Sequence, residues 1–178
     1  MTPITDLVES IERKGLWTKV LELDRNQFLK VKGSMDTNLY LVVQGSLRIF
    51  VVEENEEHTI RFGYKNNFIV ALDSFLNEMP SDLYIQALKK TTVKVIEKAT
   101  FMNFIKSSPE NSTTWQLMLE QLVLQQMERE RDILTVSPLE RYMRVLKRSP
   151  QLFQEIPHKY IASYLRMTPE TLSRIKKS

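Results

Sequence analysis

The sequence predicts an α+β fold: an N-terminal antiparallel β-roll of the jelly-roll type, one long helix, and a C-terminal bundle with a helix-turn-helix. Three observations predict it. Short runs rich in β-branched and aromatic residues, separated by turn residues, follow one another between residues 28 and 98. Residues 111–136 contain no Gly or Pro and many good helix formers. From residue 155 onward, two short helical stretches flank a tight turn. These patterns divide the chain into three domains, 1–110, 111–136 and 137–178.

The first domain is predicted to begin with a helix over residues 5–20, where apolar residues recur at helical spacing. Strands are predicted after it at residues 28–33, 39–54, 58–64, 66–70, 82–90 and 91–98. Gln44, Gly45 and Ser46 separate two apolar runs, which indicates a hairpin turn with Gly45 at the position that tolerates a positive φ. The acidic run at 53–58 indicates a solvated hairpin tip, with a metal site of carboxylates and His58 as the alternative.

The second domain is predicted to be a single helix over residues 111–136, with Ser112 or Thr113 as its cap. Its near-heptad spacing indicates a coiled-coil seam for pairing with a second copy, although packing on its own roll alone is the alternative. The residues of the predicted seam are Trp115, Leu119, Leu122, Gln126, Arg129, Ile133 and Val136. Ser137 and Pro138 then mark a hinge, after which residues 139–147 form another helix.

The last domain ends in the helix-turn-helix. Pro157 suits the start of the first helix, and Thr168 suits the N-cap of the second, with Pro169 after it. Residues 166–168 form the turn between them. One face of the second helix is polar. Its residues are three or four positions apart and so point the same way, and they cannot all be buried in the core: Glu170, Ser173, Arg174 and Lys177. A second helix that is polar and basic on one face is typical of a helix that enters the major groove of DNA.

Charge is unevenly divided along the chain. The formal net charge is +3, but residues 137–178 contain nine Lys/Arg and three Asp/Glu, whereas the preceding 136 residues contain 16 basic and 19 acidic residues. A basic end on a mildly acidic body is typical of a phosphate-binding module attached to another domain.

The C-terminal sequence, IASYL followed by TPETLSRIKK, resembles the DNA-binding end of the bacterial Crp/Fnr regulators. The resemblance implies a homodimer that binds double-stranded DNA, with RNA polymerase as a candidate partner. It implies base contacts from Glu170, Ser173 and Arg174, which base-edge chemistry also favours, because a carboxylate accepts from cytosine and a guanidinium donates twice to guanine. The expected phosphate contacts are Lys159, Thr168, Lys176 and Lys177.

Two features depart from that family's pattern. Arg166 occupies a turn position that family members usually fill with Gly, and a left-handed conformation there would cost Arg166 about 1 kcal/mol. The chain also ends just past the second helix, so it lacks the β-hairpin wing of most winged members. A wingless subgroup and a truncated chain are both consistent with this.

The stretch LYLVVQGSLRIFV is similar to the core of cyclic nucleotide-binding domains, so the resemblance spans almost the whole chain. In relatives that bind cyclic AMP, a cassette supplies a Gly-Glu pair for the ribose and an Arg-Ser pair for the phosphate. Here the glutamate is absent, Pro80 holds the arginine position, and Ser81 alone matches. Because a buried phosphate needs its cation, we expect no tight binding of a cyclic nucleotide in the usual pose.

The effector pocket is therefore expected to hold an unidentified small molecule or nothing. Its predicted lining residues are Tyr40, Leu72, Phe75 and Ser81, and for the first three of these a place in the ordinary hydrophobic core is the favoured alternative. Its rim is predicted to be acidic through Asp73, Glu78 and Asp82. An anionic ligand would then require a cation, and the candidates are Arg61, Lys89 and Lys90.

Other classes of protein receive little support. No apolar run approaches the roughly 20 residues of a membrane span, and residues 1–10 do not resemble a signal peptide, so a cytoplasmic protein without a membrane partner is expected. The absence of Cys excludes disulfides and thiolate metal sites. No phosphate loop, nucleophile elbow or metal-ligand cluster indicates an enzyme or a bound metal. The alternative function is a ligand-binding signalling module that acts through a protein partner without binding DNA.

Overall fold

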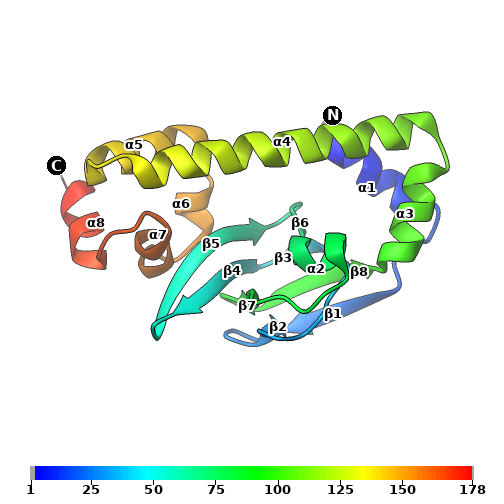
Figure 1. Cartoon of the computed structure of the whole chain (residues 1–178), viewed down its shortest axis with the longest axis horizontal. Helices are drawn as coiled ribbons and strands as arrows, with labels where there is room; N and C mark the ends of the chain where they lie inside the picture. The colour runs from blue at the N-terminus through cyan, green and yellow to red at the C-terminus, as the bar shows by residue number, and fades with distance from the viewer. Residues whose placement is uncertain (1–2, 178) are drawn as a thin grey trace.

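The computed structural model of the protein describes residues 3–177. Residues 1, 2 and 178, the ends of the predicted first and last domains, lie outside the described residues. A β-roll, one long helix above it and a cluster of short helices at one end make up the molecule (Figure 1). The predicted fold class is confirmed.

The roll consists of two antiparallel sheets that face each other, with strand orders β1-β8-β3-β6 and β2-β7-β4-β5. Apolar side chains from both sheets fill the space between them, among them Val42, Leu47 and Ile85. The strands are β1 (Lys19–Leu23), β2 (Phe28–Lys30), β3 (Leu39–Gln44), β4 (Ser46–Glu53), β5 (Glu56–Tyr64), β6 (Phe68–Ile69), β7 (Tyr84–Ala87) and β8 (Thr91–Ile96).

Both predicted turns are present. Gly45 has a φ of 92°, and a Cβ at this position would collide with Thr91. At the acidic tip, Glu54 and Asn55 have φ values of 50° and 68°, as the two-residue turns of twisted hairpins require. The acidic run therefore forms the predicted hairpin tip between β4 and β5.

The helix predicted over residues 5–20 is shorter in the structure, because α1 spans Pro3–Arg13 and residues 19–23 form β1. Gly15 follows α1 with a φ of 61°, a conformation that commonly ends helices. Lys19 then pairs with Val95 and Leu23 with Thr91 across β1 and β8. The predicted helix is therefore too long at its C-terminal end, because the apolar spacing before β1 fits a helix as well as an edge strand. Three further short helices were not predicted: α2 (Leu72–Asn77), α3 (Lys98–Lys106) and α6 (Leu152–Glu155).

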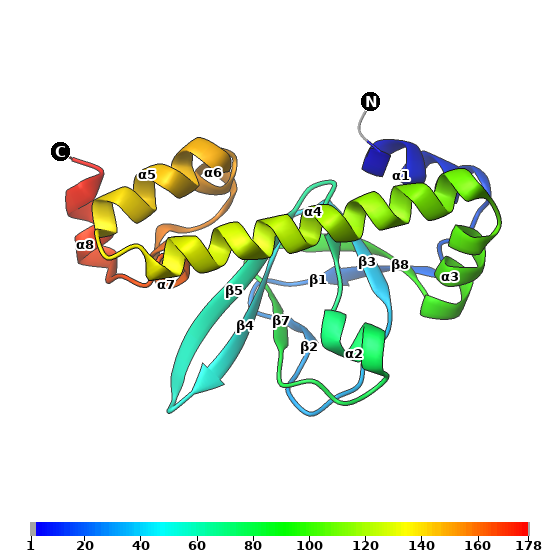
Figure 2. The same cartoon turned by 45° about the horizontal axis from the view of Figure 1, so that its top comes forward.

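The long helix, α4, spans Pro109–Leu134 and begins two residues before its predicted start. Ser108 is its cap, since its side chain accepts from the Asn111 N–H, and Pro109 occupies the first helical position. In Figures 1 and 2, α4 crosses the whole molecule, from α1 and α3 at one end to the C-terminal helices at the other.

The predicted coiled-coil seam of α4 mostly faces the protein's own roll. Trp115 packs its ring against Phe75 and Phe101, with centroids 6.2 and 5.2 Å apart. Five seam residues line a cavity between α4 and the roll: Trp115, Leu119, Leu122, Gln126 and Arg129. A different apolar stripe is exposed on α4, made of Leu117 (41% exposed), Leu124 (60%), Met127 (56%) and Leu134 (72%). The helix has two apolar faces, and heptad spacing alone does not say which one the roll covers.

The C-terminal helices are α5 (Pro138–Arg148), α6, α7 (His158–Tyr164) and α8 (Pro169–Ile175). Their buried residues, including Val145, Ile161 and Leu172, share one hydrophobic cluster with Phe62 and Leu88 of the roll. The helical end and the roll are therefore packed together. No helix within residues 3–177 is both long and apolar enough to cross a membrane.

Candidate nucleic-acid interface

The turn between α7 and α8 places Arg166 in the left-handed conformation whose cost was considered above. Arg166 has a φ of 53°, in the left-handed region, although it is not Gly. Its N–H donates to the Ser163 carbonyl at 3.1 Å, and the Met167 N–H donates to the Ala162 carbonyl at 3.0 Å. The Arg141 guanidinium donates to the Arg166 carbonyl at 3.2 Å. These bonds satisfy the backbone of the turn and fix the direction in which α8 leaves it.

The start of α8 is also as predicted. The Thr168 hydroxyl accepts from the Thr171 N–H at 3.2 Å, and Pro169 follows the cap. Leu172 is almost fully buried and anchors α8 on the bundle. Because Leu172 packs one side of α8 on the bundle, the opposite side of the helix is exposed.

The free side of α8 carries the predicted base-contacting residues. Glu170, Ser173 and Arg174 are all exposed. A hydrogen bond with its own backbone, then one with the Thr168 hydroxyl, holds the pKa of Glu170 below its ordinary value. The carboxylate is therefore ionised at neutral pH and is ready to accept hydrogen bonds. The structure thus brings a carboxylate, a hydroxyl and a guanidinium together on one edge.

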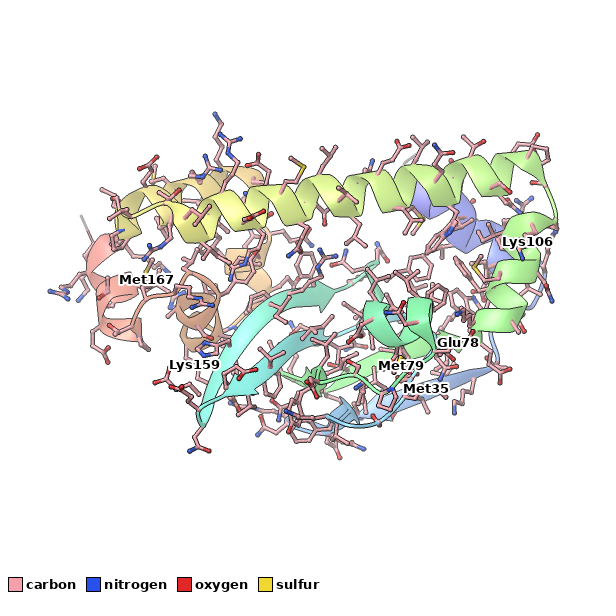
Figure 3. The ribbon with its side chains drawn as sticks, viewed as in Figure 1. Met35, Glu78, Met79, Lys106, Lys159 and Met167 are labelled. Atoms are coloured by element: carbon pink, nitrogen blue, oxygen red, sulfur yellow. The ribbon has the colours of Figure 1, made fainter. Side chains whose placement is uncertain are left out.

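All four predicted phosphate-contacting residues are exposed: Lys159 on α7, Thr168 at the start of α8, and Lys176 and Lys177 at its end. Lys159 lies on α7, with its ammonium 4.5 Å from the centroid of the Tyr160 ring (Figure 3). The Lys176 ammonium is 2.7 Å from His158 Nε2, so this histidine belongs to the same surface. Thr168 has its hydroxyl engaged in the cap, which leaves its oxygen with less capacity for another partner.

Not every basic residue of residues 137–178 is available to DNA. Arg144 and Arg148 form ion pairs with the fully buried Asp132 of α4 and with Glu128. These pairs hold α5 against the end of α4. The charge count for residues 137–178 includes both arginines as free basic residues. Their acidic partners, Glu128 and Asp132, lie before residue 137 and are counted with the preceding domains.

Contacts that the sequence did not predict hold α7 against the roll and α4. The Ser163 hydroxyl donates to the Glu57 carbonyl of β5 at 3.1 Å. The buried Arg48 of β4 lies 4.5 Å from the Tyr160 ring centroid, and Arg129 of α4 lies 3.7 Å from that of Tyr164. Tyr160 and Tyr164 are one helical turn apart, so α7 presents both rings to the same surface. That spacing is visible in the sequence, but the two partner arginines are distant in the chain.

The predicted effector-pocket residues do not surround one cavity. Leu72 lines the cavity between α4 and the roll. Tyr40 and Phe75 are buried in two different hydrophobic clusters. The Ser81 hydroxyl accepts from the Leu83 N–H at 3.0 Å. The four side chains come from different elements, with Tyr40 on β3, Leu72 and Phe75 on α2, and Ser81 in the loop between α2 and β7. Similarity to a linear motif does not reveal this arrangement.

A buried lysine holds the segment that corresponds to the phosphate cassette. Lys30 is 4% exposed, and its ammonium donates to the carbonyls of Val31, Ser81 and Leu83 at 2.9 to 3.1 Å. The Gly33 N–H donates to the Ser81 carbonyl at 2.9 Å. Lys30 and Gly33 therefore hold this segment in place through its backbone carbonyls.

The part of the chain described contains at least two cavities. The first, about 400 Å³ in volume, lies between α4, the roll and the C-terminal helices, and includes Arg61 in its wall. The second is lined in part by Met35, Glu78 and Lys106, which lie with the exposed Met79 at the end opposite Lys159 and Met167 (Figure 3).

Comparisons with known proteins agree with this architecture. The sequence profile of the cyclic nucleotide-binding domain family matches residues 20–108. A comparison with curated protein sequences finds no match. Among solved structures, FixK2 from Bradyrhizobium japonicum is similar with a TM-score of 0.70 and 16% identity, over 89% of this chain and 82% of that chain.

Two further solved structures are similar over most of both chains. The c-di-GMP responsive global regulator CLP of Xanthomonas campestris has a TM-score of 0.70 and 14% identity, over 96% of this chain and 90% of that chain. The catabolite activator protein of Thermus thermophilus has a TM-score of 0.57 and 17% identity, over 99% of this chain and 85% of that chain. The chain therefore belongs to the cyclic nucleotide-binding domain family and has the fold of the Crp/Fnr transcription regulators.

Proposed function

We propose that the protein is a cytoplasmic transcriptional regulator that binds promoter DNA as a homodimer. In this proposal residues 1–110 sense a signal, 111–136 pair two copies, and 137–178 bind DNA. The observation that carries the proposal is the exposed edge of α8, where Glu170, Ser173 and Arg174 lie together on a helix fixed by a capped start and a hydrogen-bonded turn. Their donors and acceptors suit base edges in a major groove.

Pairing along α4 is part of the proposal. Leu117, Leu124, Met127 and Leu134 recur at intervals of three and seven residues on the side of α4 that the roll leaves exposed. An exposed apolar stripe of this kind is favoured at a protein interface. Two copies joined there would present two α8 helices to successive major grooves, as symmetric helix-turn-helix dimers do.

Regulation would act through the position of α7 and α8. A signal in the roll that shifts α4 would bias an equilibrium between two placements of the helix-turn-helix. Since Pro80 replaces the cassette arginine and Lys30 holds the Ser81 backbone, the proposed signal is not cyclic AMP in its usual pose.

Selection from a library of random duplexes, followed by affinity measurements on the selected duplex at several salt concentrations, tests this function. We expect enrichment of a two-fold symmetric sequence, and an affinity that falls linearly with salt on logarithmic axes because phosphate contacts release counterions. Failure to retain any duplex at low salt would reject the proposal.

The second candidate is a signalling module that acts through a protein. Met35 and Met79 are exposed beside the second cavity, and flexible apolar side chains are favoured at protein contacts. This candidate predicts no salt-dependent affinity for DNA, so the same titration separates the two.

A further inference from the structure

Lys30 ends β2 and has a buried side chain, which is rare for lysine. Its ammonium donates to the carbonyls of Val31 at 3.1 Å, Ser81 at 3.1 Å and Leu83 at 2.9 Å. A lysine ammonium has three N–H donors, so these three carbonyls use all of them. The buried position therefore holds a cation among backbone oxygens.

Carboxylates near Lys30 favour its charged form without pairing with it. Burial lowers the pKa of Lys30, and the charges of Asp73, Asp36 and Asp82 oppose that shift. Asp82 forms an ion pair with the exposed Lys32, whereas Lys30 forms none with any residue that the structure describes. The direct partners of the buried charge are backbone carbonyls, and two of them belong to residues 79–83, the cassette segment.

Neutral backbone bonds hold the cassette segment as well. The Ser81 carbonyl also accepts from the Gly33 N–H at 2.9 Å, and the Ser81 N–H donates to the Ser34 carbonyl at 3.2 Å. A hydrogen bond from an ammonium is roughly twice as strong as a neutral one. The two bonds from Lys30 are therefore expected to contribute most to the position of Ser81 and Leu83.

The cassette segment is bonded to the end of α2. The Ser74 hydroxyl donates to the Met79 carbonyl at 2.6 Å, and the Ser74 side chain is fully buried. The Glu78 N–H donates to the Ser74 carbonyl at 2.9 Å, and the Glu78 carboxylate pairs with Lys98 of α3 at 2.7 Å. Holding the cassette segment therefore also holds the C-terminal end of α2.

Aromatic packing joins α2 to α4, which lies above it in Figure 1. Phe75 of α2 is 2% exposed, and its ring centroid lies 6.2 Å from that of Trp115 of α4, edge to face. Because protein interiors are close-packed, a shift of α2 would displace Trp115 or open a cavity beside it. The position of α4 is therefore linked to Lys30 through the cassette segment and α2.

We propose that Lys30 is an internal tether, which holds the cassette segment, α2 and α4 in one placement without an effector at that segment. An effector can shift an equilibrium only through contacts that it makes better in one state, and the bonds of Lys30 act in the same way. As a device that regulates DNA binding, the tether rests on the proposed function. Its effect on the roll does not require DNA.

Hydrogen exchange of the whole protein tests the tether. Lys30→Met keeps an unbranched side chain of similar length but removes all three hydrogen bonds. Lys32→Met, at the exposed lysine that lies 3.6 Å from Asp82, is the matched control. We expect the amides of the cassette segment and α2 to exchange at least about tenfold faster in Lys30→Met than in Lys32→Met, because bonds from a charged donor keep the segment closed. Equal exchange in the two variants would overturn the proposal.

A second variant separates the ammonium from simple packing. Lys30→Ala removes a portion of the side chain that matches propylammonium in size. We expect propylammonium to restore slow exchange to this variant, and 1-propanol, which has a similar size but no charge, to leave exchange fast. Slow exchange restored by both probes, or by neither, contradicts a cationic tether.

Affinity for the selected duplex tests the regulatory part. At one salt concentration, Lys30→Met is expected to bind about tenfold more weakly than Lys32→Met, which is within the usual range of coupling between two sites. Each variant loses one positive charge, so the comparison is matched for net charge. Equal or tighter binding by Lys30→Met would reject the tether as a regulatory device. If the unaltered protein binds no duplex while the exchange results hold, the proposed function fails and the tether stands.

Discussion

Arg166 sets the direction of α8 from a conformation that Gly adopts more readily. Its φ of 53° brings Met167 back to the Ala162 carbonyl, and the Arg141 guanidinium holds the Arg166 carbonyl from the other side. The left-handed conformation is therefore present, and hydrogen bonds around it offset the local strain. The sequence marks Arg166 as a departure from the usual Gly, but only the structure shows which conformation it takes.

Replacing Arg166 by Gly is expected to raise the free energy of unfolding by about 0.5–1 kcal/mol, since Gly enters the left-handed region without a Cβ clash. Arg166→Ala removes the same side chain and keeps the strain, so it is the matched control. Urea unfolding followed by circular dichroism measures both. A Gly variant no more stable than the Ala variant would show that the turn is not strained.

Tyr40 links stability to alkaline pH. Its buried hydroxyl donates to Asp36 Oδ2 at 2.7 Å, and burial, then this carboxylate, raises the pKa of Tyr40. Because the folded-state pKa lies above the unfolded value of about 10, the stabilisation is complete below that pH and is lost as the pH rises above it.

We therefore expect the free energy of unfolding to fall above about pH 10 more steeply in the unaltered protein than in Tyr40→Phe. At neutral pH the Phe variant should be less stable by about 1 kcal/mol for the lost hydrogen bond. Denaturant titrations across this pH range provide the comparison, and parallel pH profiles would exclude Tyr40 as the cause.

At the scale of elements, α4 has two apolar faces, one covered by the roll and one exposed. Trp115 and Leu119 face the roll, whereas Leu124 and Met127 face away from it. The sequence predicts the helix and its length to within two residues, but its predicted seam lies mostly on the covered face. Which apolar face of α4 stays exposed depends on where the roll packs. Tertiary contacts such as that between the Trp115 and Phe101 rings determine that position.

A charge on the free face is expected to prevent pairing. Leu124→Glu would place a carboxylate in an apolar interface without a partner, which costs several kcal/mol per ion. Sedimentation velocity should then show a dimer for the unaltered protein and a monomer for Leu124→Glu. Val20→Glu, at an exposed apolar residue of β1, is the control and should remain dimeric. If Leu124→Glu forms a dimer as stable as that of the unaltered protein, the dimer interface does not include this face of α4.

At the scale of the whole molecule, the roll and the C-terminal helices are one packed unit. Phe62 of β5 packs against Tyr164 of α7 with the rings tilted and their centroids 5.4 Å apart, and Arg129 of α4 lies over the Tyr164 ring. The cavity that includes Arg61 is enclosed by the same three parts. A shift of α4 would therefore act on the placement of α7 without a relay through distant elements.

The sequence predicts the architecture and the α8 edge well, because strand runs, caps and the Glu170 to Arg174 spacing are local patterns. For the predicted pocket residues, the sequence does not show which of them lie together. Tyr40 of β3 and Phe75 of α2 are buried in two different hydrophobic clusters, and Ser81 lies in the loop before β7. The contacts of Arg48 and Arg129 with α7 join residues far apart in the chain, and only the folded structure brings them together.

The most direct test of the central claim compares Arg174→Ala with Arg13→Ala, an exposed arginine of α1, for affinity to the selected duplex and to a scrambled duplex at one salt concentration. If the α8 edge contacts bases, Arg174→Ala loses about 1–3 kcal/mol of discrimination between the two duplexes, and Arg13→Ala loses none. Equal weakening of both duplexes by Arg174→Ala would contradict base recognition by this edge.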